Sequence, residues 1–318
     1  MKKNKSYLDF RTDLADERVD TYKKVHNLSK IDGVIVSNEM IDDINIVTVE
    51  VVSDNGVKAI GKPIGKYITL ELYDINYIDE LGKKALIRNI ARVIDALIED
   101  KRSIMVIGLG NIYVTPDALG PKVIKYLDVN RHLFKFAKEL VNENDKQLSG
   151  IAPGVLGTTG IETSEIIESI VKKVKPDIVI AIDSLASLSS TRVGKTVQIS
   201  NTGINPGSGV SNTRKGINED VLNVPVIALG IPTVVDMATI TNEAMDKVVS
   251  QSVDEIEKFN NENIKGNEVF VNLLNSDNRY RMIANTLNTE NYIVTPKEID
   301  QIIDKMSEIV ANGINSII

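Results

Sequence analysis

Two aspartates, Asp117 and Asp183, are the residues of this chain whose types and spacing best suit chemistry. Each is set just past the end of a predicted buried strand, the first after residues 103–108 (SIMVIG) and the second after residues 177–182 (DIVIAI). Two close carboxylates cannot both ionise comfortably and will share a proton. The ionised carboxylate would take a proton from attacking water, while the protonated one donates to a carbonyl oxygen or a leaving amine. If the two side chains meet, they predict acyl hydrolysis without histidine or cysteine.

Each aspartate taken alone also has a simpler interpretation. Asp117 follows a proline and precedes Ala118 and Leu119, so a turn or a helix cap would account for it. Asp183 would likewise suit the cap of a following turn. Reactive groups in open parallel sheets gather beyond the carboxyl ends of the strands, which favours a site formed by two such loops. Whether the two side chains meet stays open at this level.

The elements that must position these loops follow from the hydrophobic pattern. Residues 103–108, 177–182 and 224–229 are short, continuous apolar runs, as in strands buried on both faces of a sheet. Apolar residues recur at helical spacing over 79–100, from Pro121 to about Asn142, and over 163–173, 242–259 and 297–312. The alternation of strands and helices predicts an α/β fold with a mostly parallel sheet covered on both faces.

Two further segments complete the expected organisation. Residues 46–52 and 67–72 are β-branched and alternating, with turn residues between them, and predict an antiparallel pair of strands. Residues 1–30 are polar, with charges of both signs, and predict an arm or loose helix at the periphery. No internal repeat or low-complexity tract is present.

Composition excludes several classes of function. The 318 residues, 42% hydrophobic and 25% charged, have an ordinary globular composition. The absence of cysteine excludes disulfides, thiolate nucleophiles, iron-sulfur clusters and cysteine-ligated zinc, and it fits a reducing compartment. The N-terminal ten residues lack the apolar core of a signal peptide, so we expect a cytoplasmic protein with no membrane span. A net charge of -7 disfavours direct binding of nucleic acid.

The glycine-rich segments suggest a peptide cleft more than a nucleotide site. Gly108 and Gly110 begin a possible dinucleotide fingerprint, but its third glycine falls on Tyr113, and there is no P-loop. The loop at residues 200–214 is rich in residues that allow close backbone approach, so it suits either a peptide cleft or a surface loop. Basic residues near these loops are candidates for selecting an acidic substrate residue: Arg192, Lys195 and Arg214.

Distinctive motifs are spread along nearly the whole chain: R-T-D-L-A at Arg11, G-K-Y-I-T-L-E at Gly65, G-L-G-N at Gly108, T-P-D-A-L-G-P at Thr115, A-I-D-S-L-A-S at Ala181, N-T-G-I-N-P-G-S-G at Asn201 and V-T-P-K-E-I-D at Val294. Together these motifs resemble those of the germination proteases of endospore-forming bacteria, a family of atypical aspartic-type endopeptidases.

The resemblance implies a site, a fold and partners. Asp117 and Asp183 are implied as the catalytic carboxylates, with Asn201, Gly203, Arg192 and Arg214 as candidate substrate-binding residues. No metal and no cofactor are implied. The implied fold is a three-layer αβα arrangement with a mostly parallel central sheet, like that of hydrogenase maturation endopeptidases, plus a small β subsheet. The implied substrates are small acid-soluble spore proteins, the implied assembly is a homotetramer, and the implied location is the forespore and spore core.

The resemblance also gives the N-terminal segment a role. Members of the family are made as zymogens that cleave themselves at a site resembling those in their substrates: an acidic residue, a hydrophobic residue, Ala and a downstream Glu. Residues 12–17 (TDLADE) fit with a cut between Asp13 and Leu14. Residues 1–13 are then a propeptide and residues 14–318 a single α/β protease domain. Asp13 replaces the Glu usual in substrates, which would suit slow, regulated self-processing.

Three other functions stay open on sequence grounds. The G-x-G-N loop also resembles that of hydrogenase maturation endopeptidases, which recognise nickel with acids and a histidine, but neither His26 nor His132 lies late in the chain where that ligand belongs. A serine hydrolase would use Ser184 or Ser187 with Lys195, although no nucleophile-elbow motif is present. The third is a non-catalytic module that binds spore proteins or peptides through its acidic loops.

Overall fold

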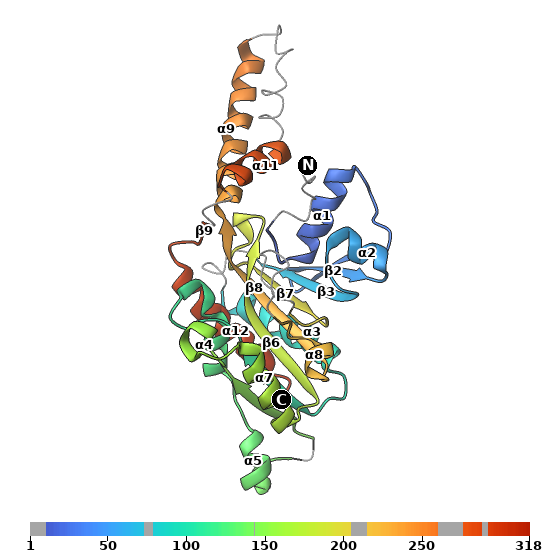
Figure 1. The fold of residues 1–318 in the computed structure, drawn as a ribbon, viewed down its shortest axis with the longest axis vertical. Helices are drawn as coiled ribbons and strands as arrows, with labels where there is room; N and C mark the ends of the chain where they lie inside the picture. The colour runs from blue at the N-terminus through green and yellow to red at the C-terminus, as the bar shows by residue number, and fades with distance from the viewer. Residues whose placement is uncertain (1–10, 73–78, 143, 205–214, 260–275, 288–291) are drawn as a thin grey trace.

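One mixed sheet forms the centre of the computed structural model, which describes residues 11–318 except 73–78, 143, 205–214, 260–275 and 288–291. Within those residues the sheet has nine strands in the order β1-β2-β3-β7-β8-β6-β4-β5, with β9 paired to β8. Parallel pairing joins β5, β4, β6 and β8, and antiparallel pairing joins β8 to β7, β3, β2 and β1 in turn. Figure 1 shows helices packed around this sheet.

The strands span Val34–Ile41 (β1), Ile44–Val51 (β2), Gly65–Glu71 (β3), Ser103–Gly108 (β4), Gln147–Ile151 (β5), Ile178–Ser187 (β6), Thr196–Ser200 (β7), Val226–Asp236 (β8) and Ile293–Val294 (β9). The α-helices span Ala15–His26 (α1), Asp54–Ile60 (α2), Glu80–Ile98 (α3), Leu119–Lys125 (α4), Arg131–Phe136 (α5), Leu156–Thr159 (α6), Thr163–Val174 (α7), Glu219–Leu222 (α8), Met237–Phe259 (α9), Ser276–Leu287 (α11) and Ile299–Asn315 (α12). Short 3₁₀ helices span Thr115–Asp117 (η3), Lys138–Leu140 (η4) and Ser190–Arg192 (η5).

The two faces of the sheet bury different residues because side chains alternate along each strand. On β6, Ile178, Ile180 and Ile182 belong to the larger core, which includes residues of α3, α4 and α12. Val179 and Ala181 face the other way, into a core shared with α7 and α8. A third cluster packs α1 and α2 on β2 and β3. Helices therefore cover both faces, and the predicted α/β class with a mostly parallel centre is confirmed.

The predicted antiparallel pair is also confirmed, because β2 pairs with β3 from Asn45↔Glu71 to Val51↔Gly65. These strands do not form a separate subsheet. Ile68 pairs with Ile199 of β7, so β1, β2 and β3 extend the central sheet. The join matters for function because it brings β3 and the chain before it next to the carboxyl end of the parallel strands.

The four long predicted helices are confirmed as α3, α7, α9 and α12, with small shifts at their ends. The helical pattern expected from Pro121 to about Asn142 is only partly confirmed, because the chain forms the short helices α4, α5 and η4 there. Asn130 explains the break. Its side chain accepts a hydrogen bond from the Leu148 amide (2.7 Å) and donates one to the Lys146 carbonyl (2.9 Å), which ties the chain to β5 and competes with continued helix.

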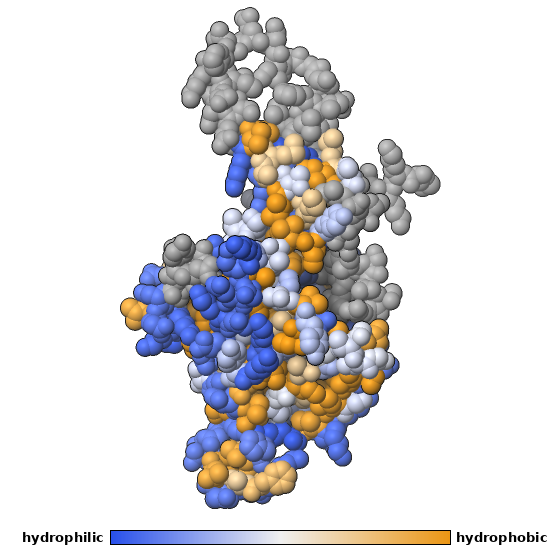
Figure 2. Space-filling model, turned by 90° about the vertical axis from the view of Figure 1, so that its left-hand side faces the viewer, coloured by the Kyte–Doolittle hydropathy of each residue, from blue (hydrophilic) through white to orange (hydrophobic). Residues whose placement is uncertain are grey.

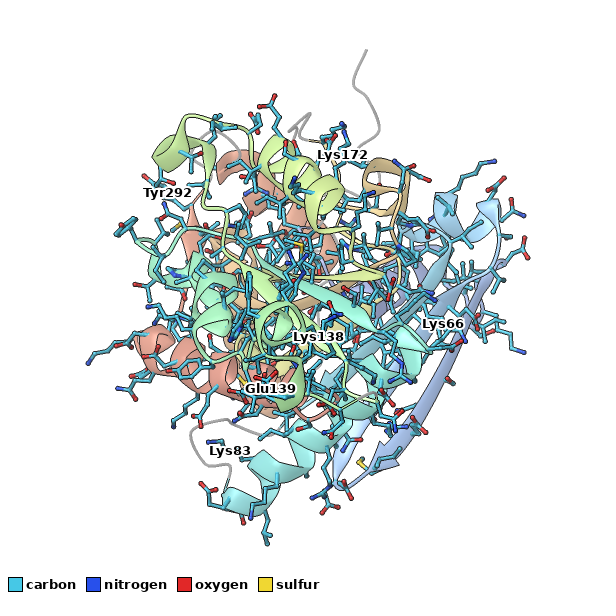
Figure 3. The ribbon with its side chains drawn as sticks, turned by 90° about the horizontal axis from the view of Figure 1, so that it is seen from below. Lys66, Lys83, Lys138, Glu139, Lys172 and Tyr292 are labelled. Carbon is cyan, nitrogen blue, oxygen red and sulfur yellow. The ribbon has the colours of Figure 1, made fainter. Side chains whose placement is uncertain are left out.

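The prediction that the N-terminal segment is peripheral is wrong. Leu14, Ala15 and Val19 have at most 1% of their surface exposed, and the polar residues Thr12, Asp16, Glu17 and Arg18 are buried as well. Several lysines elsewhere in the chain are less buried: Lys66 and Lys172 are exposed, and Lys83 and Lys172 lie toward the outline of the molecule in Figure 3. Burial of a polar segment requires specific partners, which are described with the site below.

The surface combines charged regions with scattered apolar side chains (Figure 2). Phe136 of α5 is 85% exposed and Leu140 of η4 is 67% exposed. Among the described residues, no helix is long and apolar enough to cross a membrane.

Candidate active site

A cavity lies over the strands β3, β7, β8 and β6, and Asp183 and Asp13 both line it. Its walls come from four adjacent strands (β3, β7, β8 and β6), from the N-terminal segment, from the turn after α2 and from the residues that follow β7. Its lining residues include Asp13, Lys62, Tyr67, Asp183, Leu185 and Gln198. The cavity therefore collects residues from five parts of the chain: 13, 61–67, 183–185, 198–204 and 228–230.

Strand register explains why Asp183 reaches this cavity. Gly230 of β8 pairs with Asp183 of β6 on one side and with Gln198 of β7 on the other. Paired residues on neighbouring strands present their side chains to the same face, with strands about 4.8 Å apart. A Cβ on Gly230 would meet the side chain of Leu185 at 2.5 Å, so glycine keeps open the floor between Asp183 and Gln198.

The prediction that Asp183 begins a loop is wrong in detail. β6 continues to Ser187, because β8 also continues and pairs with it through Val235. The pairing of β6 with β4, however, ends at Ile182 and Gly108. Asp183 is thus the first residue of β6 beyond the end of β4. It lies at a crevice beyond the carboxyl end of a parallel strand, as predicted from the sequence.

Asp117 closes the loop that follows β4. It is the last residue of η3, and its Oδ2 accepts a hydrogen bond from the amide of Asn111 (2.8 Å). Gly110 permits this turn: its φ is +110°, and a Cβ there would lie 2.0 Å from the carbonyl oxygen of Asp117. Asp117 does not cap α4, whose N-cap is Ala118.

The electrostatics of the site centre on Asp183. Burial, followed by the negative charge of Asp117 and to a smaller extent that of Asp13, raises the pKa of Asp183 to about 7. A hydrogen bond from the amide of Ser184 to Oδ1 (2.9 Å) opposes the shift. The structure thus brings Asp117 within electrostatic reach of Asp183 and places a carboxyl group there that can hold a proton near neutral pH.

The N-terminal segment lies along β6 like an additional short strand. The amide of Asp13 donates to the carbonyl of Ala186 (2.9 Å), and the amide of Ala186 donates to Oδ2 of Asp13 (2.8 Å). Upstream, Arg11 forms an ion pair with Asp236 (3.1 Å). Downstream, Leu14 is fully buried. The peptide bond between Asp13 and Leu14 is therefore held at the cavity that contains Asp183.

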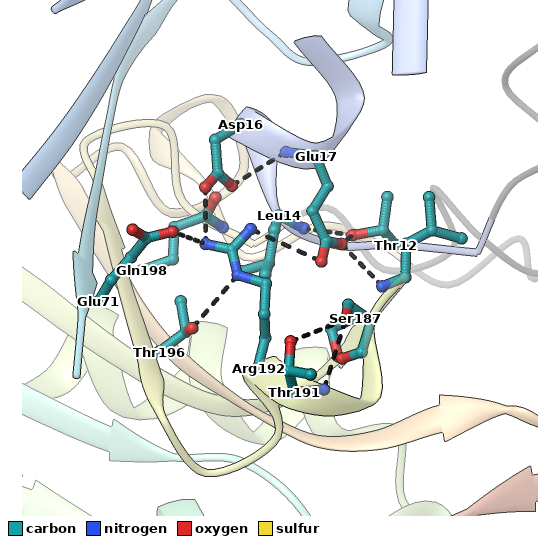
Figure 4. Close-up of polar contacts among 12 residues, drawn as sticks. Thr12, Leu14, Asp16, Glu17, Glu71, Ser187, Thr191, Arg192, Thr196 and Gln198 are labelled. Atoms are coloured by element: carbon teal, nitrogen blue, oxygen red, sulfur yellow. Dashed lines mark hydrogen bonds and ion pairs between the residues drawn. The ribbon is translucent and has the colours of Figure 1, made fainter. Parts of the chain in front are cut away.

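Arg192 anchors the segment downstream of that bond (Figure 4). Its guanidinium lies 2.6 Å from Asp16, 3.6 Å from Glu17 and 3.1 Å from Glu71 of β3. Glu17 also accepts hydrogen bonds from the hydroxyl of Thr12 and from the amide of Leu188. Burial raises the pKa of Glu17, while Thr12, Arg192 and the Leu188 amide oppose the shift.

The other predicted substrate-binding residues differ in position. Gly203 lines the cavity, with a φ of +68° and no room for a Cβ beside the carbonyl of Ile217. Asn201 lies at the β3–β7 edge, where its Oδ1 accepts from the amide of Lys66 (2.9 Å). Arg214 lies outside the described residues.

Two polar residues of the cavity were not anticipated from the sequence: Lys62 and Gln198. Nζ of Lys62 donates to the carbonyl of Asp13 (2.8 Å), as does Nε2 of Gln198 (3.1 Å). A glutamine between Val197 and Ile199 of a short apolar run was a signal, since a buried polar side chain needs partners. Lys62 carried no such signal, because it sits between Gly61 and Pro63 in what resembles an ordinary turn.

Within the part of the chain that the structure describes, no three His, Asp or Glu side chains gather as a metal ion would require. The expectation that no metal is needed stays a prediction, to be tested with a chelator.

A chain segment held beside Asp183, with one backbone carbonyl turned into a polar cavity, is an arrangement that would suit a peptidase. The comparisons with known proteins agree with that class. Residues 12–266 match the family model described as germination protease. The chain is 45% identical over 313 residues to the germination protease of Clostridium perfringens, covering 96% of this chain and 94% of the relative. It is 39% identical over 348 residues to that of Priestia megaterium, covering 98% and 94%.

The chain belongs to the germination protease family, and it is accordingly a peptidase. A solved structure of a NiFe hydrogenase maturation protease from Thermococcus kodakarensis also aligns, at 16% identity, covering 62% of this chain and 97% of that one. Its TM-score is 0.29, too low to bear on the fold or the site.

Proposed function

We propose that this peptidase is an endopeptidase of small acid-soluble spore proteins that uses Asp117 and Asp183 to activate water, and that it first cleaves its own Asp13–Leu14 bond. Residues 1–13 are then a propeptide and residues 14–318 the protease domain. The homotetramer and the spore-core location implied by the family resemblance remain predictions.

One observation carries the proposal: the Asp13–Leu14 bond, chosen from sequence, lies at the cavity lined by Asp183. Asp183, with its pKa raised to about 7 by burial and by Asp117, supplies the protonated carboxyl that the chemistry needs. The Asn111 amide donates to Asp117, and such a hydrogen bond stabilises a carboxylate that accepts a proton from water. Acid and base are thereby assigned to different aspartates.

Selection of an acidic residue before the cut is supported by two groups near Asp13. The Ala186 amide donates to the Asp13 carboxylate, and the positive charge of Lys62 interacts favourably with it. Arg192 would bind the downstream acid of a substrate as it binds Asp16 and Glu17 here. These contacts match the expected pattern of an acidic residue, a hydrophobic residue, Ala and a later Glu.

The serine hydrolase alternative finds little support. Ser184 follows Asp183 on β6 and so points to the opposite face of the sheet. Its hydroxyl is buried without a hydrogen-bond partner. The hydroxyl of Ser187 donates to the carbonyl of Ser189 (2.8 Å). Neither serine is therefore arranged as a nucleophile activated by Lys195.

The test combines processing of the full chain with cleavage of a short peptide containing T-E-F-A-S-E. We expect wild-type protein to yield a new N-terminus at Leu14 and to cut the peptide after its first Glu, with chelator and serine-directed inhibitor present. Asp13→Ala should block processing, and Asp13→Glu should process at least as fast as wild type. If Asp13→Ala matures like wild type, the Asp13–Leu14 bond is not the processing site. Inhibition by a chelator would favour the nickel-recognising alternative. Binding of the peptide without turnover would favour a non-catalytic module.

A further inference from the structure

The carbonyl oxygen of Asp13 accepts two hydrogen bonds from side chains rather than from a backbone ladder. Nζ of Lys62 lies 2.8 Å from it and Nε2 of Gln198 lies 3.1 Å from it. A regular strand beside β6 would offer its carbonyl to the Ala186 amide, but here the Asp13 carboxylate takes that donor. The carbonyl is left free to turn into the cavity, toward a cation and an amide.

Gln198 holds both sides of the Asp13–Leu14 bond. While its Nε2 donates to the carbonyl before the bond, its Oε1 accepts from the amide of Ala15 (2.7 Å). The two contacts fix the amide orientation of Gln198, since one atom must donate and the other accept. Gln198 is only 8% exposed, and it lies in register with Gly230 and Asp183. The donor is therefore rigidly placed opposite the acid.

Lys62 brings a charge to the same oxygen. It follows Gly61, the left-handed cap of α2 with a φ of 68°, which turns the chain into the cavity. Its Nζ lies 6.0 Å from the centre of the Tyr67 ring. The residue as a whole is half-buried, but burial of its ammonium group lowers the pKa of Lys62, and the charge of Arg18 acts in the same direction while Asp13 opposes both. Withdrawal from water strengthens the interaction of this ammonium with a developing negative charge.

We propose that Lys62 and Gln198 form the oxyanion-stabilising pair of this peptidase, binding the carbonyl oxygen of the residue before the cut more strongly as it becomes negative. This inference rests on the proposed function. Water adds to the carbonyl carbon of Asp13 while Asp117 takes its proton, and the π electron pair moves to the oxygen held by Lys62 and Gln198. The pair then re-forms the carbonyl as the C–N bond breaks, and Asp183 gives its proton to the nitrogen of Leu14. Asp183 therefore serves as the proton donor to the leaving amine, and Lys62 and Gln198 stabilise the oxyanion.

The test measures the first-order rate of self-cleavage of the full chain at about pH 6, by the appearance of the Leu14 N-terminus. Lys62→Met keeps an unbranched side chain of nearly the same length and removes the charge, and Gln198→Glu keeps the shape and replaces the donor with an acceptor. We expect each to slow cleavage about 100-fold, the effect of losing one oxyanion donor. Lys62→Arg, which keeps a charged donor, should recover part of the loss. The matched control is Lys66→Met, four residues along, whose side chain is half exposed.

A second readout separates stabilisation of the transition state from simple positioning of the segment. Hydrogen exchange at the amides of residues 14–19 should be as slow in uncleaved Lys62→Met as in uncleaved Asp183→Asn. Loss of that protection with the same loss of rate would show that Lys62 only holds the segment, which overturns the inference. The inference would be overturned if Lys62→Met and Gln198→Glu cleaved themselves at the wild-type rate. If Asp183→Asn stayed uncleaved in the same assay, the proposed function would still stand. If Lys62→Met does not fold, the rate of Gln198→Glu decides alone.

Discussion

Asp183 lies close enough to Asp117 that the negative charge of Asp117 adds to the larger effect of burial, and together they raise the pKa of Asp183 to about 7. The pair spans the end of β4: Asp117 closes the loop after it, and Asp183 is the first residue of β6 beyond it. Asp183 can therefore hold a proton near neutral pH, and that proton is the one proposed to pass to the leaving amine.

Self-cleavage should depend on pH with a single descending limb near neutrality. Asp183 must be protonated to donate to the leaving amine, and its protonated fraction falls as pH rises through about 7. We expect the rate to be nearly constant somewhat below that value and to fall about tenfold for each pH unit above it. The measurement is the appearance of the Leu14 N-terminus between about pH 5 and pH 8.5. A rate that increases with pH across this window would contradict the assignment of Asp183 as the acid.

The stability of Asp183→Asn gives an independent check on the same pKa. In the wild type, the folded pKa of Asp183 lies above the ordinary value of 3.8, so the folded state binds the extra proton and loses stability as pH rises from about 4 to about 7. The free energy of unfolding lost over this pH range is up to about 4 kcal/mol. Asparagine does not ionise, so Asp183→Asn does not lose stability in this way. Urea unfolding should show Asp183→Asn more stable than wild type at about pH 8 and similar to it at about pH 4; equal differences at both pH values would contradict the shift.

Arg192→Gln should release the segment downstream of the cut. Three carboxylates share this guanidinium, and Asp16 and Glu17 are themselves buried, so removing one partner leaves uncompensated charge. We expect a loss of about 3 kcal/mol in the free energy of unfolding, together with slower self-cleavage. Arg88→Gln is the matched control, since its ion pair with Asp42 is exposed and is worth less than about 1 kcal/mol. Similar losses in both variants would mean that Arg192 has no special role.

Gly110→Ala tests whether the loop after β4 positions Asp117. A Cβ at Gly110 would lie 2.0 Å from the backbone of Asp117, and the φ of +110° is unsuited to alanine. We expect a large loss of self-cleavage and a destabilisation of more than about 2 kcal/mol. Gly157→Ala is the control, because a Cβ there meets nothing within 4 Å. Normal processing by Gly110→Ala would show that Asp117 does not need this turn.

The parallel centre of the fold could be predicted from sequence because its strands are continuous apolar runs, as at Ser103–Gly108. The exact end of β6 could not be predicted, since its extension past Ile182 depends on pairing with β8 rather than on local composition. The two aspartates were found from their place after such strands. Lys62 and Gln198 were not, because they become neighbours only when β7 and the turn after α2 meet over the N-terminal segment.

The proposed mechanism requires Asp117 and Asp183 to act together on the Asp13–Leu14 bond. The decisive measurement is the rate at which purified full-length Asp117→Asn and Asp183→Asn, each prepared separately, produce the Leu14 N-terminus. Asp100→Asn, a change at an exposed position, is the control. We expect both site variants to fold and remain uncleaved, while the control matures like wild type. Near-normal processing by either site variant would contradict the mechanism and remove that aspartate from it.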